Sequence, residues 1–390
     1  MLTLDTTEEI QEYGCMALIN LTADELNNKI RVKNNGGVMA IVCCLQNFHN
    51  CSDIVLSALK TLGNIIELDE VCRQLVDEGG LKTIVNIASR YKDNGDIQLF
   101  AAMVLSGLSE IKDLGSDVIH TVDAALMSIC SLDDPHLSMY ACQAMENLLN
   151  TERGPRTFTD EKRLDVILKM MKDFSDHPEI IRVCCKIIAM LALVEDIKKE
   201  IPYQAVSMVI ESLKNFVQLD DLQIVGCGAL SSLSENNKTL AQSIVENDGV
   251  GVLASALERH QSEERVHVVV MITLANLLPI DKEKHGTACE TAASLIEQSM
   301  SMFPEIVAVQ VAACEAIAKF RIADLPDPSV LIDSLKHVLR RHKDKSELMK
   351  PAAAALRIFW QDGYRKEADE ILECTPALKS VFLSTEIDEK

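Results

Sequence analysis

The sequence has few aromatic residues and a single tryptophan. Phe, Trp and Tyr make up 4% of its 390 residues, although hydrophobic residues make up 48%. A core of helices packed by Leu, Ile, Val, Ala and Met suits this composition, whereas β-strands are enriched in aromatic and β-branched residues. The shortage of aromatics therefore favours an all-α fold over a sheet.

The sequence also lacks motifs typical of catalytic and metal sites. It contains no G-x-x-x-x-G-K-[ST], no G-x-S-x-G and no H-E-x-x-H segment. His337 and His342 are five residues apart, whereas two metal ligands on one face of a helix are usually four apart. We therefore expect a protein that is not an enzyme, with no catalytic residues, no metal site and no cofactor.

Long apolar runs, a signal-like N-terminus and an excess of positive charge are absent as well. Asp and Glu outnumber Lys and Arg by 59 to 38, and the net charge of −21 would repel phosphate backbones. We expect no nucleic-acid binding and no membrane insertion. Thirteen cysteines without a C-x-x-C motif suggest reduced thiols in a cytoplasmic protein, with the nucleus as the other possible compartment. Five of these cysteines lie beside apolar core positions and are expected to be buried: Cys15, Cys142, Cys184, Cys227 and Cys314.

What the sequence does contain is a five-residue pattern that returns along the whole chain. The pattern reads small or apolar, apolar, variable, Asn or a substitute, apolar, as in Ala144-Met145-Glu146-Asn147-Leu148. Its fourth positions are residues 20, 64, 107, 147, 190, 232, 276, 319 and 358. A period of about 42 residues is typical of a helical solenoid.

Each period begins with a short helix and a glycine corner before a medium and a long helix. Gly79-Gly80-Leu81-Lys82-Thr83-Ile84-Val85 and Gly36-Gly37-Val38-Met39-Ala40-Ile41-Val42 mark two such corners, and Asn247-Asp248-Gly249-Val250 is a weaker copy. Together with the five-residue pattern at the end of the long helix, these segments resemble armadillo repeats. The resemblance implies an all-α, right-handed superhelical solenoid of about eight to nine three-helix armadillo-like repeats.

We expect one solenoid over residues 1–383, with repeats that end near residues 22, 66, 110, 150, 194, 234, 278, 322 and 361. An amphipathic segment over 364–383 is predicted to cap it, because the end of a solenoid needs a polar outer face. Residues 151–158 are predicted to form a surface loop and residues 384–390 a disordered tail. The chain opens directly on a long helix, so its start is either an abbreviated cap or part of a longer protein.

The resemblance also implies a partner-binding groove on the concave side. In the armadillo family the motif Asn faces an extended peptide there, and an Asn amide both donates to and accepts from a peptide backbone. Residues four apart share a helix face, so the side chain one turn before the motif position belongs to the same strip. The predicted groove residues are Asn20, Lys60, Asn64, Gln143, Asn147, Lys186, Asn276 and Lys319.

The lysines of this set reverse the local sign of an acidic chain, which favours an extended acidic partner segment. Two other interpretations stay open. The asparagines can instead bond to carbonyl groups within the solenoid, and the lysines can simply cover apolar helix surface.

These observations favour a non-catalytic protein–protein interaction scaffold or adaptor that binds a partner segment along the concave groove. The alternative is a chaperone-like protein, or a regulator of a GTPase or motor, that acts on a folded client through a wider patch. Nuclear-import adaptors of the family carry a row of Trp one turn before the motif Asn, and this row has no Trp here. A nuclear-import adaptor is therefore less favoured, as is an enzyme regulatory subunit, and the sequence does not indicate an oligomeric state.

Overall fold

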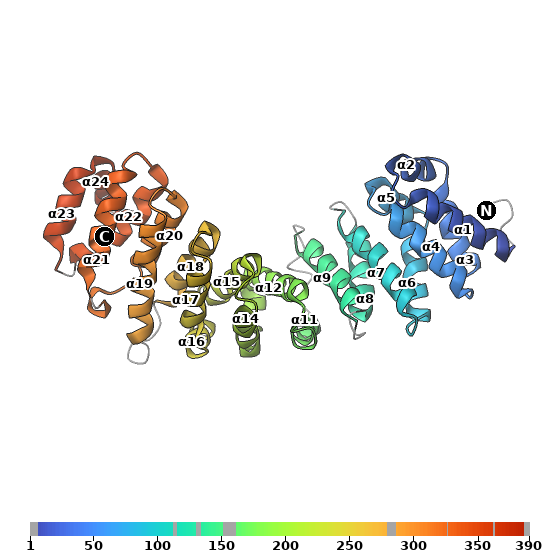
Figure 1. The fold of residues 1–390 in the computed structure, drawn as a ribbon, viewed down its shortest axis with the longest axis horizontal. Helices are drawn as coiled ribbons and strands as arrows, with labels where there is room; N and C mark the ends of the chain where they lie inside the picture. The colour runs from blue at the N-terminus through green and yellow to red at the C-terminus, as the bar shows by residue number, and fades with distance from the viewer. Residues whose placement is uncertain are drawn as a thin grey trace. The chain divides into compact units, whose positions relative to one another are not determined.

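In the computed structural model, the chain folds into α-helices joined by turns (Figure 1). The structure describes residues 7–111, 115–129, 134–150, 161–278, 286–325, 327–361 and 363–385. Over these ranges there are 23 α-helices, one short 3₁₀ helix and no β-strand, and 81% of the residues are helical. The prediction of an all-α solenoid is confirmed. The loop predicted over 151–158 lies outside the described residues.

The five-residue motifs fall on the last helix of each repeat, as predicted, although in the eighth repeat this helix is not the longest. We call these the third helices, because up to two other helices precede each of them in a repeat. They are α1 (Glu8–Thr22), α4 (Ser52–Ile65), α7 (Gly95–Ser109), α9 (Pro135–Leu149), α12 (Pro178–Ala192), α15 (Asp220–Ser234), α18 (Glu264–Leu277), α20 (Val307–Ile317) and α22 (Ser346–Gln361).

The eighth motif departs from the others, because its helix ends before the motif does. Helix α20 stops at Ile317, and the amide of Phe320 donates to the Ile317 carbonyl at 3.0 Å, a tighter i to i+3 bond. Phe320 and Ile322 are both buried, and burying them draws the chain away from the helix axis. Lys319 therefore lies in a turn beyond the helix and not on the helix face.

The other helices of each repeat come before its third helix. The second helices are α3 (Gly37–Asn47), α6 (Gly80–Arg90), α8 (Ser116–Ile129), α11 (Glu161–Asp173), α14 (Tyr203–Asn215), α17 (Gly249–Arg259), α19 (Gly286–Met302) and α21 (Pro328–Arg341). The first helices are α2 (Leu26–Asn34), α5 (Asp69–Asp77), the single turn α13 (Glu195–Lys198) and α16 (Lys238–Glu246), and the 3₁₀ helix η2 (Ile322–Asp324) takes this place in the ninth repeat. Several repeats thus have two helices, and not three, within the described residues.

The chain divides into two compact units, Met1–Ile187 and Ile188–Lys390. Within each unit the third helices pack against one another in sequence order, and the second helices form a second layer against them. The apolar core lies between these two layers. The third helices therefore present their remaining side on one surface of each unit.

The two glycines at each corner have different roles. Gly36 and Gly79 adopt left-handed backbone conformations, with φ of 76° and 74°, that favour glycine. The glycine that follows is needed for space, since a Cβ at Gly80 would lie 2.8 Å from the carbonyl oxygen of Leu75. In the weaker copy, Asp248 takes the left-handed position with φ of 67°, which Asp tolerates better than most residues.

Three repeats have a buried, hydrogen-bonded glutamine that was not predicted from the sequence. Each one lies on a third helix, nine residues before the fourth motif position, and its Nε2 donates to two carbonyl oxygens at the end of the second helix. These glutamine bridges are Gln98 to Ala88 and Tyr91 (2.7 and 2.8 Å), Gln223 to Leu213 and Phe216 (3.0 and 3.0 Å), and Gln310 to Met300 and Phe303 (3.0 and 2.8 Å). Carbonyl groups at a helix end have no partner within the helix, so each bridge satisfies them and fixes the second helix to the third.

The C-terminal segment predicted as a cap forms two helices, α23 (Arg365–Cys374) and α24 (Pro376–Thr385), which pack against α22. Arg357 of α22 donates to the carbonyl oxygen of Phe382 at 3.1 Å and lies over its ring. The outward side of α23 is charged, as a solenoid end requires. The first two residues of the predicted disordered tail are the last two of α24, and residues 386–390 lie outside the described residues.

The five cysteines predicted to be buried are all 0% exposed. Burial raises the pKa of Cys227 and of Cys314 to about 12. The hydrogen bond with Cys44, together with burial, raises the pKa of Cys15. Because all five side chains are buried out of reach of a reagent, we expect a thiol reagent to modify them slowly in the folded protein.

Cys374 is exposed at the end of α23 and provides an internal reference. Mass spectrometry after timed labelling should show Cys374 modified first, and the five buried cysteines only after denaturant is added. Rapid labelling of all five in native buffer would contradict the helix packing.

Candidate functional site

The candidate site is the surface formed by the accessible side chains of the third helices, which we call the third-helix face. On most of these helices the accessible residues are the fourth motif position and the residues four, seven and eight before it. These positions lie on one side of a helix. Because successive third helices are in contact, the positions join across α1, α4, α7 and α9 in the first unit and across α15, α18, α20 and α22 in the second.

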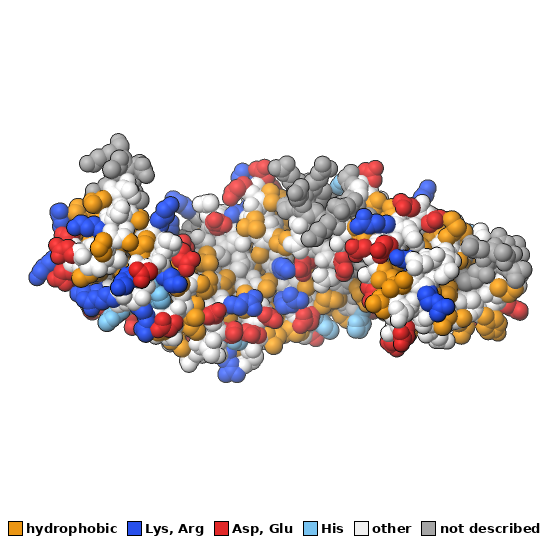
Figure 2. Space-filling view, turned by 90° about the horizontal axis from the view of Figure 1, so that it is seen from above, with side chains coloured by type: hydrophobic (Ala, Val, Ile, Leu, Met, Phe, Trp, Pro, Cys, Tyr) orange, Lys and Arg blue, Asp and Glu red, His pale blue; other side chains and the backbone are white. Residues whose placement is uncertain are grey.

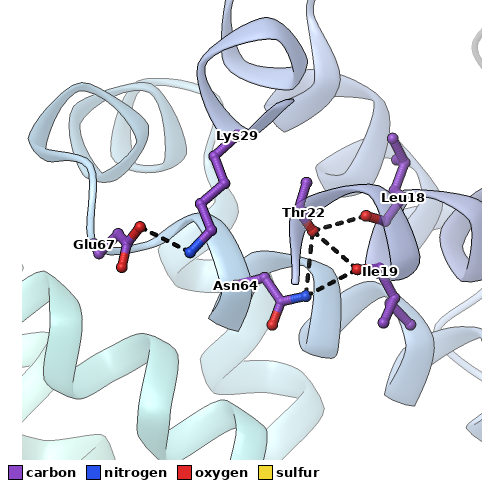
Figure 3. Close-up of polar contacts among 6 residues, drawn as sticks. All are labelled: Leu18, Ile19, Thr22, Lys29, Asn64 and Glu67. Atoms are coloured by element: carbon purple, nitrogen blue, oxygen red, sulfur yellow. Dashed lines mark hydrogen bonds and ion pairs between the residues drawn. The ribbon is translucent and has the colours of Figure 1, made fainter. Parts of the chain in front are cut away.

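Asn64 is held by the preceding third helix (Figure 3). Its Nδ2 donates to the Ile19 carbonyl oxygen and to Thr22 Oγ1, both at 3.2 Å. Thr22 in turn donates to the Leu18 carbonyl oxygen at 2.7 Å. The nitrogen of the Asn64 amide is thus occupied within the solenoid, while its oxygen has no partner among the described residues.

Asn147 and Asn276 make the same kind of contact. Asn147 Nδ2 donates to Ser109 Oγ at 3.1 Å, and Asn276 Nδ2 donates to the carbonyl oxygen of Ser231 at 3.1 Å. Gln143 donates to the oxygen of Asn147 at 3.4 Å, which joins two of the predicted groove residues. In these three repeats, therefore, the motif Asn bonds to the helix before it, which is one of the two interpretations left open by the sequence.

Asn20 differs, because it is exposed on α1 and its side chain has no hydrogen bond to the described residues. We therefore expect Asn64→Ala to lower the free energy of unfolding by about 1 kcal/mol, the usual net value of a lost hydrogen bond. Asn20→Ala should change it by less than about 0.5 kcal/mol. Urea denaturation of both variants measures the difference, and equal effects would show that the Asn64 contacts contribute nothing.

Gly107 shows why the row of asparagines is interrupted. A Cβ at this position would lie 2.7 Å from Cγ1 of Ile66, a side chain that is itself 7% exposed. Real Cβ atoms do not approach so closely, so the close packing of α7 against the end of α4 excludes an Asn here.

The three predicted lysines are in different environments. Lys60 lies with its Nζ 5.3 Å from the ring centroid of Phe100, a distance at which a cation is attracted to the ring face. Lys186 forms an ion pair with Glu146, whose side chain is largely buried, so its charge is compensated within the protein. Lys319 is exposed, in the turn after α20.

Asn276 and Lys319 come together at one pocket of the second unit. The pocket has a volume of about 320 Å³ and is lined by Ser234, Asn236, Asn237, Lys238, Ala241, Ala275, Asn276 and Lys319. We call it the two-lysine pocket. Neither lysine forms an ion pair within the described residues, so the pocket offers uncompensated positive charge beside an amide. The sequence reading missed Lys238, because it lies on a first helix and outside the motif rows.

The sequence reading also missed the apolar rows of the third-helix face. The residues seven and eight positions before the fourth motif position are partly accessible and mostly apolar. In the first unit they include Leu56, Leu99, Phe100, Met139 and Tyr140, and in the second Ile224, Val225, Val268, Val269 and Val311. These rows can be found in the sequence by extending the motif spacing two turns back, and they make the face substantially apolar.

Within the described ranges no group of three or more His, Cys, Asp or Glu side chains could hold a metal ion. No helix in the described part of the chain is both long and apolar enough to cross a membrane. On the face drawn in Figure 2, acidic side chains are dispersed along the chain, whereas Lys and Arg gather over its C-terminal helices.

Comparisons with known proteins agree with this architecture. Residues 1–119 match the family model for the protein zer-1 homolog-like, C-terminal domain. An engineered protein solved by the Northeast Structural Genomics Consortium is 19% identical over 97% of this chain and 94% of its own, with a TM-score of 0.78. The designed armadillo repeat protein YIII(Dq)4CqI is 16% identical over 62% of this chain and 99% of its own, with a TM-score of 0.52.

A search of curated proteins found no match. The repeat spacing, the two helical layers and the similarity to a designed armadillo protein agree with one another. The chain is an armadillo-like α-solenoid.

Proposed function

We propose that the chain is a non-catalytic scaffold or adaptor that binds a segment of a partner protein along the third-helix face. The main support for this proposal is that the third-helix face is continuous within each unit. Successive third helices place accessible side chains at the same positions, and these form rows along the unit. A row of this kind suits an extended segment, which also repeats its side chains at regular intervals.

The bonded asparagines support this proposal in a modified form. Because the Nδ2 atoms of Asn64 and Asn276 are held by the preceding helix, each amide is fixed in orientation. Each oxygen has no partner among the described residues and can accept a hydrogen bond from a partner backbone N–H. We propose that these asparagines act as acceptors only, whereas Asn147 accepts from Gln143 already.

The two-lysine pocket supports an acidic partner segment. Lys238 and Lys319 face a pocket without a carboxylate among its lining residues, so a partner carboxylate there would gain two favourable charge interactions. Lys60 adds a further positive charge in the first unit, whereas Lys186 adds little because Glu146 compensates it. A charged contact of this kind should make association sensitive to salt.

A second candidate function is a chaperone-like or GTPase- or motor-regulating protein that acts on a folded client. The apolar rows favour it, because a folded client is bound through a wide patch and needs no extended segment. Both candidates use the third-helix face, and we propose the cytoplasm as the compartment for either. The extended segment ranks first, because within the first unit Asn20, Asn64 and Asn147 occupy the same position of their repeats.

A comparison of matched variants tests the proposal. Ile272 on the third-helix face is 39% exposed, and Val330 on the second helix α21 is 42% exposed. The double variant Ile272→Glu with Lys319→Glu should lose partners that the wild type retains in a quantitative affinity capture from cells. The control, Val330→Glu with Lys343→Glu, changes two exposed residues away from this face and should retain them.

Circular dichroism must show the same helical content for both variants. Loss of the same partners in the control, or retention of all partners in the Ile272 and Lys319 variant, would contradict binding at the third-helix face.

A further inference from the structure

On α15, α18 and α20 the apolar rows of the second unit are unlike those of the first, because they contain only aliphatic residues. Val268, Val269 and Ile272 lie on one side of α18. Ile224 of α15 and Val311 of α20 lie on the neighbouring third helices, which contact α18. These five residues, together with Val225 of α15, form what we call the aliphatic strip. Branched side chains are stiff, so the strip presents a surface of fixed shape.

Gly228 leaves open space beside this strip. It lies on α15, four residues before the fourth motif position, where each of the other repeats has a side chain: Met, Lys, Gln, Ile, Glu or Ala. A Cβ at Gly228 would meet only Cγ2 of Val269, at 3.8 Å, which is an ordinary contact. The missing side chain therefore leaves a hollow in front of Val269, where an aliphatic group of a partner can be buried.

The two-lysine pocket adjoins the strip at the C-terminal end of α18. Ile272 and Asn276 are four residues apart on this helix, about 6 Å along its axis. Asn276 lines the pocket together with Lys238 and Lys319. Glu315 of α20 is exposed one turn before Lys319, and it forms no ion pair with Lys319 in the described part of the chain. Positive charge thus lies at one edge of an aliphatic surface.

Two carboxylates, Glu235 at the C-cap of α15 and Glu315, lie nearer the pocket, whereas four lie at the other edge. Helix α15 begins with Asp220 and Asp221, and α18 is preceded by Glu263 and begins with Glu264. They are most of a helix away from Asn276 and Lys319 along the helix axes. Both lysines lie on the side of the pocket and most of the carboxylates on the other, so an acidic group of a partner is favoured on the side of the pocket.

We infer that the aliphatic strip and the two-lysine pocket together bind a protein segment with aliphatic side chains and an acidic residue at one end. This inference rests on the proposed function and names the class of partner for one part of the third-helix face. Three adjacent helices spaced about 10 Å apart span about 20 Å, which an extended chain covers in about six residues at roughly 3.3 Å each. Aromatic side chains are not required, because the strip offers no aromatic ring for stacking.

Selection of a phage-displayed library of random twelve-residue peptides on the full chain tests the inference. The selected sequences should be enriched in Ile, Leu or Val together with Asp or Glu. A fluorescein-labelled peptide from the selection should bind the wild type, and Val269→Glu or Gly228→Phe should weaken its binding at least tenfold by fluorescence anisotropy. Val330→Glu should bind it as the wild type does.

Charge reversal then tests the pocket. The double variant Lys238→Glu with Lys319→Glu should bind the acidic peptide at least tenfold more weakly than the wild type does. A peptide in which Lys replaces the acidic residue should bind this variant again. If selected peptides are basic or aromatic but lose binding in Ile272→Glu, the inference is wrong while the proposed function stands. If no peptide is selected, the inference is contradicted, and if no variant of the face affects a selected peptide, both are contradicted.

Discussion

Replacing Gly249 with alanine should destabilise the protein by about 2–3 kcal/mol, the usual cost of forcing extra volume into a tightly packed site. A Cβ at Gly249 would lie 2.6 Å from the carbonyl oxygen of Ile244 and 2.3 Å from its Cγ2. The side chain can move, but the backbone oxygen belongs to helix α16 and cannot move without opening the corner between α16 and α17. Thermal or urea denaturation monitored by circular dichroism measures the loss.

Gly228→Ala is the matched control, since it makes the same chemical change in the same unit. Its new Cβ would meet only Val269, at 3.8 Å. Alanine in a helix interior is more stable than glycine by roughly 0.5–1 kcal/mol, so this variant should gain stability. Equal effects of the two substitutions, or no loss in Gly249→Ala, would refute the role assigned to the second glycine of the corner.

The second large effect is a dependence on pH that His267→Gln should remove. His267 lies on α18, nine residues before the fourth motif position, where three other repeats have a bridging glutamine. It is 0% exposed, its Nδ1 lies 2.9 Å from Ser299 Oγ, and its Nε2 has no partner in the described structure. Burial lowers the pKa of His267 from its ordinary 6.5 to about 4.

The sign of the effect follows from this lowered pKa. Below pH 6.5 the unfolded chain binds a proton at His267 that the folded protein binds only near pH 4. Stability is therefore greatest above pH 6.5 and falls as the pH decreases toward 4, with a loss of about 2 kcal/mol at pH 5. A glutamine does not titrate, and it can donate to the end of α17 as the glutamine bridges do elsewhere.

Urea denaturation at pH 7 and pH 5 checks this prediction. His267→Gln should be within about 1 kcal/mol of the wild type at pH 7 and more stable than it by about 2 kcal/mol at pH 5. His120, exposed on α8, provides the control, since His120→Gln should leave the pH dependence unchanged. The same pH dependence in wild type and His267→Gln would show that His267 is not held neutral by the fold.

The fold could be predicted from the sequence because it depends on repetition. The motif around Asn147 recurs at a nearly constant spacing, so each copy supports the interpretation of the others. The end of α20 could not be predicted in this way. It depends on the burial of Phe320 and Ile322, and this depends on contacts between segments that the spacing does not reveal.

The candidate site could be predicted only in part. The motif positions place Asn64 and Asn147 on one face of the first unit and Asn276 on the corresponding face of the second, as the structure does. The pattern does not say which atoms of each amide are free. The ion pair that compensates the charge of Lys186 joins it to Glu146 of another repeat. The two lysines that line one pocket, Lys238 and Lys319, also come from different repeats. Neighbours in adjacent repeats are about 40 residues apart in sequence, so only the structure brings them together.

Site-specific photo-crosslinking tests the central claim, that the third-helix face binds the partner. A benzophenone amino acid would replace Ile272 in one protein and Val330 in another, since the two side chains are almost equally exposed. We predict that irradiation in cells gives covalent adducts with a discrete partner from position 272 and none of these from position 330. Adducts with the same partner from position 330 alone would contradict the account.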